Sequence, residues 1–277
     1  MTTKPVRIDI PGAGQLALTL SGRLETHSTR RLHTHAYHQV LVIWNGVSLL
    51  VDTTRKQPLF GAMTAFIPAD LPHRSTVIGQ EVGYKSLYLA PELFAPSSFE
   101  ISIFNVSALG SALFHRINIR HAGDLGFGLN RECLDLFLKI LPEDMARPSD
   151  LVRLPEPSQL QNRKVVGFIE ENFDRRLTMG DFIAAFSYSE RHLTRLFKAD
   201  LKITIFEYVR LYRVLMASIK LSDASRTIAE VVYDCGYESI SSFYRDFNLI
   251  FAVTPKAFQD RMTRCPQVDR PSHDALR

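Results

Sequence analysis

The chain is poor in cysteine and lacks a long apolar run. Its 277 residues include 3 cysteines and 1 tryptophan. Cys133, Cys235 and Cys265 never form a Cys-x-x-Cys pair, which argues against a disulfide framework and against a thiolate zinc site. No segment approaches the roughly eighteen apolar residues of a membrane span, and no apolar stretch follows a basic N-terminus. We therefore expect a cytoplasmic protein with no membrane partner.

A strong excess of one charge sign is also missing. The 33 Lys and Arg residues against 29 Asp and Glu residues give a net charge of +4. This balance permits DNA binding but does not indicate it, because DNA binding depends on whether the positive groups lie on one face of the protein. With 45% hydrophobic and 22% charged residues, the composition is that of an ordinary globular protein, and the length favours two domains.

Prolines interrupt the middle of the chain and should prevent a continuous helix there. They are Pro142, Pro148, Pro155 and Pro157. We place a linker at residues 151–160, between a domain at 1–150 and a domain at 161–264. The polar tail at 265–277 is expected to be disordered.

The N-terminal domain shows the pattern of short strands, rich in β-branched and aromatic residues and separated by glycine and proline. The runs are 40–44, 47–51, 64–67 and 84–88. They predict a small antiparallel barrel or sandwich. Residues 126–141 then predict a helix with one apolar stripe. The stripe consists of Leu129, Cys133, Leu136, Phe137 and Ile140. It either packs against the barrel or pairs with its copy in a homodimer.

The C-terminal domain repeats one pattern at an offset of 49 residues. Thr178 to Tyr188 and Thr227 to Tyr237 each predict a short amphipathic helix, and Ser189 and Ser239 are then placed to cap a second helix. Two helices joined by a tight turn form a helix-turn-helix unit, whose second helix fits the major groove of DNA. The two units, at about 178–198 and 227–248, therefore predict contact with double-stranded DNA in two grooves.

Particular motifs in this region resemble the DNA-binding domain of the AraC/XylS family of bacterial transcription regulators. They are Arg191-His-Leu-Thr-Arg-Leu-Phe-Lys198, Ile228-Ala-Glu-Val-Val-Tyr-Asp-Cys-Gly-Tyr237, Ser242-Phe-Tyr-Arg-Asp-Phe247 and Thr254-Pro-Lys-Ala-Phe258. The resemblance covers residues 161–264 and implies two helix-turn-helix units joined by a long helix, here 204–222. With the strands before them, the fold class is α+β, with a cupin-like N-terminal β-barrel, a flanking helix and an all-α C-terminal domain.

The chain departs from the family pattern at positions where glycine is usual. Ser187 lies in the first turn, Lys202 follows the first recognition helix, and Ala252 lies in the last loop. Each should be forced toward a positive φ at a cost of about 1 kcal/mol. Gly236 keeps the glycine of the second unit.

Position on each second helix predicts which side chains face DNA. In the first, Leu193, Leu196 and Phe197 should be buried; in the second, Phe243 and Phe247. The exposed residues are Arg191, Thr194, Arg195, Lys198, Ile240, Ser241, Tyr244 and Arg245. Arginine can donate two hydrogen bonds to guanine, whereas isoleucine and tyrosine cannot make such bidentate contacts. We therefore expect the second helix to contribute methyl and phosphate contacts and less base recognition.

A weaker motif lies in the N-terminal domain. His33, His35 and Gln39 resemble the first metal motif of the cupin barrels, with glutamine where a glutamate ligand is usual, and Pro68 to His73 resembles the second, with Asp70 in place of its glycine. We expect no metal and no cofactor, but a pocket for a small-molecule effector. It is lined by some of His33, His35, Gln39, Trp44 and His73.

Different functions fit these features. The preferred one is a sequence-specific transcription regulator, not an enzyme, controlled by the effector and contacting RNA polymerase if it is an activator. The alternatives are a metal-dependent cupin enzyme with a helical appendage and a constitutive DNA-binding regulator without effector. The duplicated motif favours a regulator, because an enzyme has no need of two groove-binding units.

Overall fold

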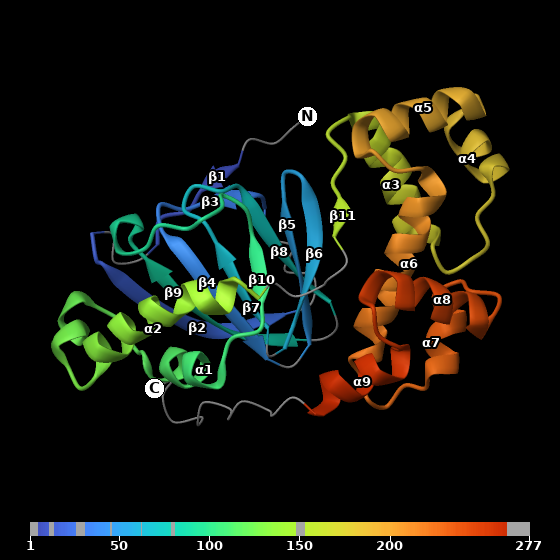
Figure 1. Ribbon diagram of the computed structural model, residues 1–277. Helices are drawn as coiled ribbons and strands as arrows, with labels where there is room; N and C mark the ends of the chain where they lie inside the picture. The colour runs from blue at the N-terminus through green and yellow to red at the C-terminus, as the bar shows by residue number, and fades with distance from the viewer. Residues whose placement is uncertain are drawn as a thin grey trace. The chain divides into compact units, whose positions relative to one another are not determined.

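The computed structural model describes residues 5–10, 14–25, 31–44, 46–61, 63–78, 81–147 and 153–264. Its contacts divide the chain into two units, an N-terminal one that contains most of the strands and a helical C-terminal one that also takes in Val51–Pro58 (Figure 1). The tail expected at 265–277 lies outside the described residues. None of the helices described is long and apolar enough to cross a membrane.

Two sheets carry the strands, in the orders β1-β3-β8-β5-β6-β11 and β10-β7-β4-β9-β2. The strands are β1 (Val6–Arg7), β2 (Ala17–Glu25), β3 (His33–Thr34), β4 (His38–Trp44), β5 (Val47–Asp52), β6 (Arg55–Phe60), β7 (Thr64–Ile67), β8 (His73–Ile78), β9 (Glu81–Leu89), β10 (Ser102–Phe104) and β11 (Leu154–Pro155). The four predicted runs lie within β4, β5, β7 and β9. β1 and β3 pair in parallel, whereas β4 pairs antiparallel with both β7 and β9.

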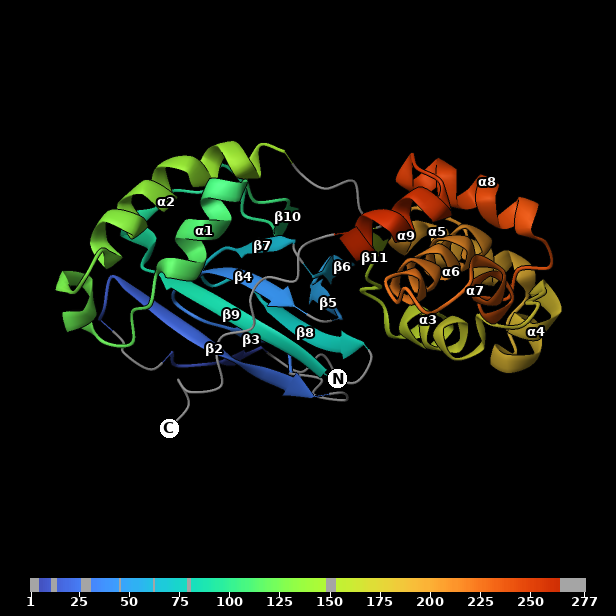
Figure 2. The same cartoon turned by 90° about the horizontal axis from the view of Figure 1, so that it is seen from below.

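Helices α1 (Ala108–Arg116) and α2 (Asn130–Met145) lie over the second sheet of the N-terminal unit (Figure 2). Val40 and Val42 of β4 pack into the same apolar core as these helices, because alternate strand residues face one side of a sheet. The predicted apolar stripe of α2 is divided. Cys133 and Phe137 are buried in that core and Ile140 packs against it, whereas Leu129 and Leu136 are 56% and 42% exposed.

The prediction that Pro142 stops a helix is wrong. α2 continues through Pro142 to Met145. Proline forfeits one backbone hydrogen bond in a helix, but here the residues on either side are held by packing. Leu141 is fully buried, and the buried Asp144 accepts a hydrogen bond from Ser107, the residue that caps α1, at 3.0 Å. Tertiary contacts therefore stabilise the last turn of α2, which follows the proline.

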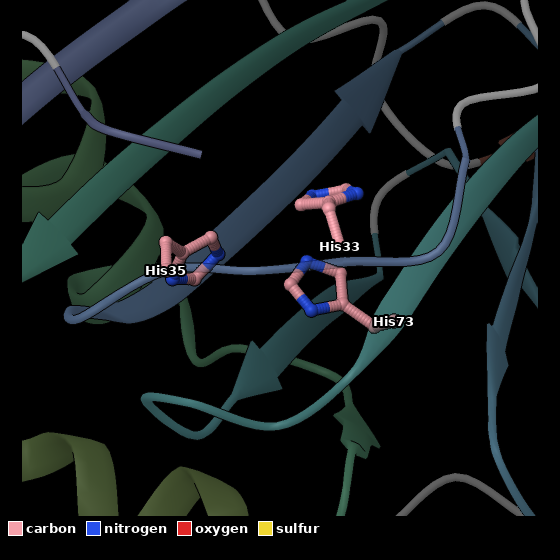
Figure 3. Close-up of side chains that lie close together, drawn as sticks. All are labelled: His33, His35 and His73. Atoms are coloured by element: carbon pink, nitrogen blue, oxygen red, sulfur yellow. The ribbon is translucent and has the colours of Figure 1, made fainter. Parts of the chain in front are cut away.

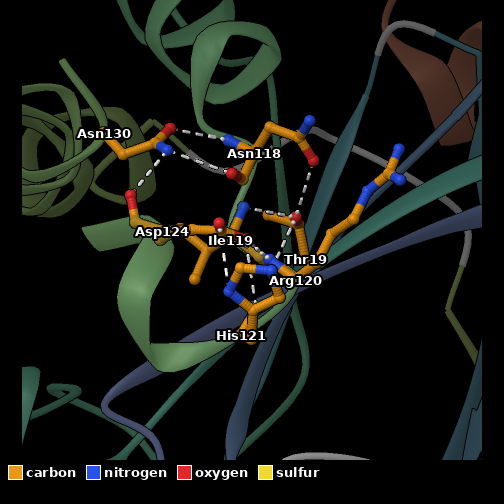
Figure 4. Close-up of polar contacts among 7 residues, drawn as sticks. All are labelled: Thr19, Asn118, Ile119, Arg120, His121, Asp124 and Asn130. Atoms are coloured by element: carbon orange, nitrogen blue, oxygen red, sulfur yellow. Dashed lines mark hydrogen bonds and ion pairs between the residues drawn. The ribbon is translucent and has the colours of Figure 1, made fainter. Parts of the chain in front are cut away.

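The segment between α1 and α2, which includes the 3-10 helix η2 (Ala122–Gly126), is fixed by side chains (Figure 4). Asn130 accepts from the Asn118 backbone N–H at 3.0 Å and donates to the carbonyls of Asn118 and Asp124. The Thr19 hydroxyl accepts from the Ile119 N–H at 2.8 Å and donates to its carbonyl at 3.0 Å. The Thr19 N–H also donates to the Ile119 carbonyl at 2.6 Å, so these bonds tie the segment between α1 and α2 to β2.

The C-terminal unit consists mainly of helices, and the helices of the two helix-turn-helix units begin where the sequence predicts. The helices of the C-terminal unit are α3 (Leu160–Asn172), α4 (Met179–Phe186), α5 (Glu190–Leu201), α6 (Ile205–Leu221), α7 (Ile228–Asp234), α8 (Ile240–Phe251) and α9 (Pro255–Arg264). Ser189 and Ser239 cap α5 and α8 as predicted, each accepting from the backbone three residues on. The 17 residues of α6 span roughly 26 Å at about 1.5 Å each, and α6 contacts both helix-turn-helix units.

The residues that replace glycine adopt the left-handed conformation, as predicted. The φ angles of Ser187, Lys202 and Ala252 are 55°, 64° and 54°. Gly236 has a φ of 73°, and a Cβ added there would lie 2.4 Å from the Phe173 carbonyl oxygen. The backbone is therefore strained at the ends of α4, α5 and α8, whereas glycine is retained at position 236, where a side chain would not fit.

Candidate functional site

The exposed face of α5 carries the side chains predicted to contact DNA. Leu193 and Phe197 are buried, as expected, while Leu196 is only partly so. Arg191, Arg195 and Lys198 are exposed on the opposite side. They contribute to an open hollow of about 770 Å³. Its lining residues are Glu190, Arg191, Thr194, Arg195, Lys198 and Ala199. Three cations and a hydroxyl thus gather on one accessible helix face, as binding to base edges and phosphates requires.

The face of α8 has the same geometry with different chemistry. Phe243 and Phe247 are fully buried. Ile240, Ser241 and Arg245 are exposed and Tyr244 is partly exposed. The first turn of α8 contains no acidic residue, so the positive end of the helix dipole is not offset by a carboxylate there and suits an anionic group.

Carboxylates cap the helices that support these faces. Asp181 accepts hydrogen bonds from the hydroxyl and the backbone N–H of Thr178, and these bonds lower its pKa to about 2. Glu230 likewise accepts hydrogen bonds from the backbone N–H and the hydroxyl of Thr227, and these bonds lower the pKa of the Glu230 carboxyl. Both are capping boxes, so the two units begin with the same device.

The N-terminal unit brings together three of the residues predicted to bind an effector. His33, His35 and His73 are all buried, and their potential ligand nitrogens lie within 4.8 Å of one another (Figure 3). The chain folds this way because β3 pairs with β8 at His33 and His73. The ring centroids of this pair are 4.4 Å apart, and those of His35 and His73 are 4.9 Å apart.

Gln39 joins this cluster. Its side-chain oxygen lies 3.1 Å from Nε2 of His35, and its amide nitrogen donates to the Ser86 hydroxyl at 2.8 Å. Burial lowers the pKa of His35, which favours the neutral ring. Sequence reasoning missed Ser86 and also Tyr88, whose ring lies 5.3 Å from that of His35. Strand alternation could have found them, because Ser86 and Tyr88 pair across the sheet with Leu41 and Gln39.

Two further positions clarify the motif. Asp70, where the cupin motif has glycine, has a φ of 58°, and its N–H donates to the His35 carbonyl at 2.8 Å. Trp44 is not brought to the cluster: strand alternation places it on the face of β4 opposite Gln39. Its indole lies across Gly83, where an added Cβ would come within 2.2 Å of Nε1.

Comparison with known proteins agrees with both regions. The model of the AraC-like ligand binding domain matches residues 18–119, and a helix-turn-helix domain model matches residues 183–261. The TetD protein of transposon Tn10 from Escherichia coli is 32% identical over 97 residues, which cover 35% of this chain and 70% of TetD. The regulatory protein SoxS of Salmonella typhimurium is 31% identical over 98 residues, 35% of this chain and 92% of SoxS.

One relative extends over both units. The transcriptional activator RhaS of Mannheimia succiniciproducens is 22% identical over 242 residues, covering 81% of this chain and 87% of RhaS. SoxS is named as a regulatory protein and RhaS as a transcriptional activator, which agrees with the prediction of a transcription regulator. The paired helix-turn-helix units and the ligand-binding domain together identify the chain as a DNA-binding member of the AraC/XylS family of transcription regulators.

Proposed function

We propose that α5 and α8 are the recognition helices, with α5 supplying most of the base recognition. The observation that carries this is the accessible cationic face of α5, opposite a helix side that is buried by Leu193 and Phe197. Arg191 and Arg195 lie four residues apart and so project from one side of the helix. α8 contributes Ile240 and Tyr244, together with Ser241 and Arg245, to methyl and phosphate contacts.

Substitutions on α5 test this assignment. Arg195→Ala should weaken specific binding by about 1–3 kcal/mol and relax the preference at one base position. Lys198→Ala should instead weaken binding to all sequences and flatten its salt dependence, because a phosphate contact carries no sequence information. Fluorescence anisotropy with an operator duplex and a scrambled duplex, at several salt concentrations, separates these results. Unchanged affinity and preference in Arg195→Ala would show that α5 is misassigned.

The cluster of His33, His35, Gln39 and His73 is the proposed effector site. Buried polar groups converge there from β3, β4 and β8, as in sites that orient a small polar ligand. Gln39→Ala in the full chain should reduce the response of DNA binding to an effector and leave binding without effector near normal. Thermal-shift screening of small polar molecules against wild type and Gln39→Ala identifies such an effector. A hit that stabilises both proteins equally would place the effector elsewhere.

Assembly into a homodimer is the remaining part of the proposal. Leu129, the N-cap residue of α2, and Leu136 within the helix are exposed, so this side of the helix is available to a second copy about a two-fold axis. Sedimentation of wild type against Leu136→Glu tests it, because a charge at the interface should shift a dimer toward monomer. We also expect the protein to be cytoplasmic, where it has access to promoters. Contact with RNA polymerase is expected if the protein activates transcription.

A further inference from the structure

The three clustered histidines share one hydrogen-bonding arrangement. Nδ1 of His33 lies 3.0 Å from the Arg31 carbonyl oxygen, Nδ1 of His35 2.7 Å from that of Tyr37, and Nδ1 of His73 2.8 Å from that of Leu71. A carbonyl oxygen only accepts, so each ring must carry its proton on Nδ1. In a neutral ring the lone pair is then on Nε2. Donation from one ring nitrogen to a backbone carbonyl is how proteins orient histidines whose other nitrogen binds a metal.

The rings are close enough to share one ion. Zinc binds imidazole nitrogen at about 2.1 Å, so two nitrogens on one ion are at most ~4.2 Å apart. The ligand nitrogens of His33, His35 and His73 already lie within 4.8 Å of one another, so small side-chain movements suffice. Among the residues that the structure describes, this is the group of three or more metal-capable side chains that stands together.

Gln39 completes the arrangement. Donation from its amide nitrogen to Ser86 directs the amide oxygen at Nε2 of His35, 3.1 Å away. With the His35 proton on Nδ1, two electron pairs face each other in a buried site, which is unfavourable unless a positive group lies beside both. Two ligands at about 2.1 Å from one ion and 90–110° apart are separated by roughly 3.0–3.4 Å. The observed distance is within that range.

We propose that the three rings and the Gln39 amide oxygen bind one divalent first-row transition-metal ion. Imidazole nitrogen suits zinc, iron, copper and nickel, whereas magnesium and calcium prefer oxygen ligands. This names the ligand chemistry of the pocket proposed above as the effector site, and it departs from the sequence expectation of a pocket without metal. The metal site rests on the proposed effector pocket for its location alone and is independent of DNA binding.

Calorimetric titration of the full chain, stripped with a chelator, tests the proposal with Zn²⁺ as the probe. Wild type should bind one equivalent per chain, and Mg²⁺ should give no saturable signal. His73→Ala should lower zinc affinity by at least about 10–100-fold, the range that loss of even an outer-shell partner costs. Equal binding by wild type and His73→Ala would place zinc elsewhere and overturn the proposal, as would the lack of a one-to-one isotherm in wild type.

A second variant guards against misfolding. Gln39→Glu puts a carboxylate beside the ion, where it offsets part of the positive charge, so affinity should rise by about tenfold or more. A misfolded variant cannot produce this gain. If the Gln39 amide is instead turned so that its nitrogen donates to His35, the network needs no ion, and wild type will show no tight one-to-one binding of zinc, which overturns the proposal.

His38 offers a matched control. It is buried on the opposite face of β4 from Gln39, where its Nδ1 accepts from the Ala69 N–H at 2.9 Å. His38→Asn removes an imidazole and keeps an acceptor, so zinc affinity should stay within about twofold of wild type; a loss as large as that of His73→Ala would count against the assigned ligands. Fluorescence anisotropy with operator DNA, measured on the same samples, tests DNA binding separately. A negative result for zinc binding therefore leaves the test of the DNA-binding proposal intact.

Discussion

The two helix-turn-helix units share a scaffold and differ at the turn and on the exposed helix face. Each begins with a threonine and a carboxylate in a capping box and places a serine before its second helix. The turn of the first unit places Ser187 in the left-handed region, whereas the second uses Gly236. The first presents arginines and a lysine to solvent, and the second presents an isoleucine and a tyrosine beside one arginine.

The surroundings of the turns explain the first difference. Ser187 is exposed, so its side chain has room and the chain bears only the backbone strain. At Gly236 a Cβ would meet the Phe173 carbonyl, the Arg213 guanidinium and the backbone of Asp174. The same backbone angle is therefore tolerable for serine in one unit and sterically closed to any side chain in the other.

The largest expected effect comes from closing that space. Gly236→Ala should lower the free energy of unfolding by about 2–5 kcal/mol, the sum of left-handed strain and overpacking. Gly167→Ala is the control, since an added Cβ in α3 meets nothing within 4 Å; alanine should raise stability there by about 0.5–1 kcal/mol. Urea denaturation measures both, and equal effects at the two glycines would refute the steric argument.

A smaller, opposite effect is expected in the first unit. Ser187→Gly should raise the free energy of unfolding by about 1 kcal/mol, because glycine adopts a positive φ without the clash of a Cβ. Ser187→Ala keeps the Cβ and should give no such gain. If urea denaturation shows the alanine variant to be as stable as the glycine variant, the φ of 55° does not store the proposed strain.

The smallest effect concerns acid. The pKa of Asp181 is lowered to about 2, below the value of about 4 in an unfolded chain. Its contribution to stability is therefore present above about pH 4 and is lost as the pH falls toward 2. Asp181→Asn should be less stable than wild type at pH 6, and the gap should narrow as the pH drops below 4. A gap that stays constant in thermal unfolding across this range contradicts the capping role.

The sequence predicted most of the helical unit because its signals are local. A serine or threonine cap and an apolar spacing of three to four residues act within one helix, so α4, α5, α7 and α8 begin where expected. Pro142 shows the limit. Its effect on α2 is decided by contacts of Leu141 and Asp144 with distant residues, and such contacts are invisible in a local pattern.

The barrel site was predictable only in part for the same reason. His33, His35 and Gln39 are neighbours in sequence, and their motif identified them. The position of Trp44 depends on the alternation along β4, and that of Ser86 depends on the pairing of β4 with β9. The alternation that excludes Trp44 is a local pattern, whereas the register between β4 and β9 joins segments that are distant in sequence.

The central claim is that two unlike recognition helices act together, with α5 supplying most of the base recognition. In vitro selection of duplexes by the full chain tests it most directly. The selected sites should contain two blocks about one helical turn, or 10 bp, apart, and one block should show much stronger base preference, weakened at one position in Arg195→Ala. A single block, or a strong block that Arg195→Ala leaves intact while Arg245→Ala relaxes it, would contradict this account.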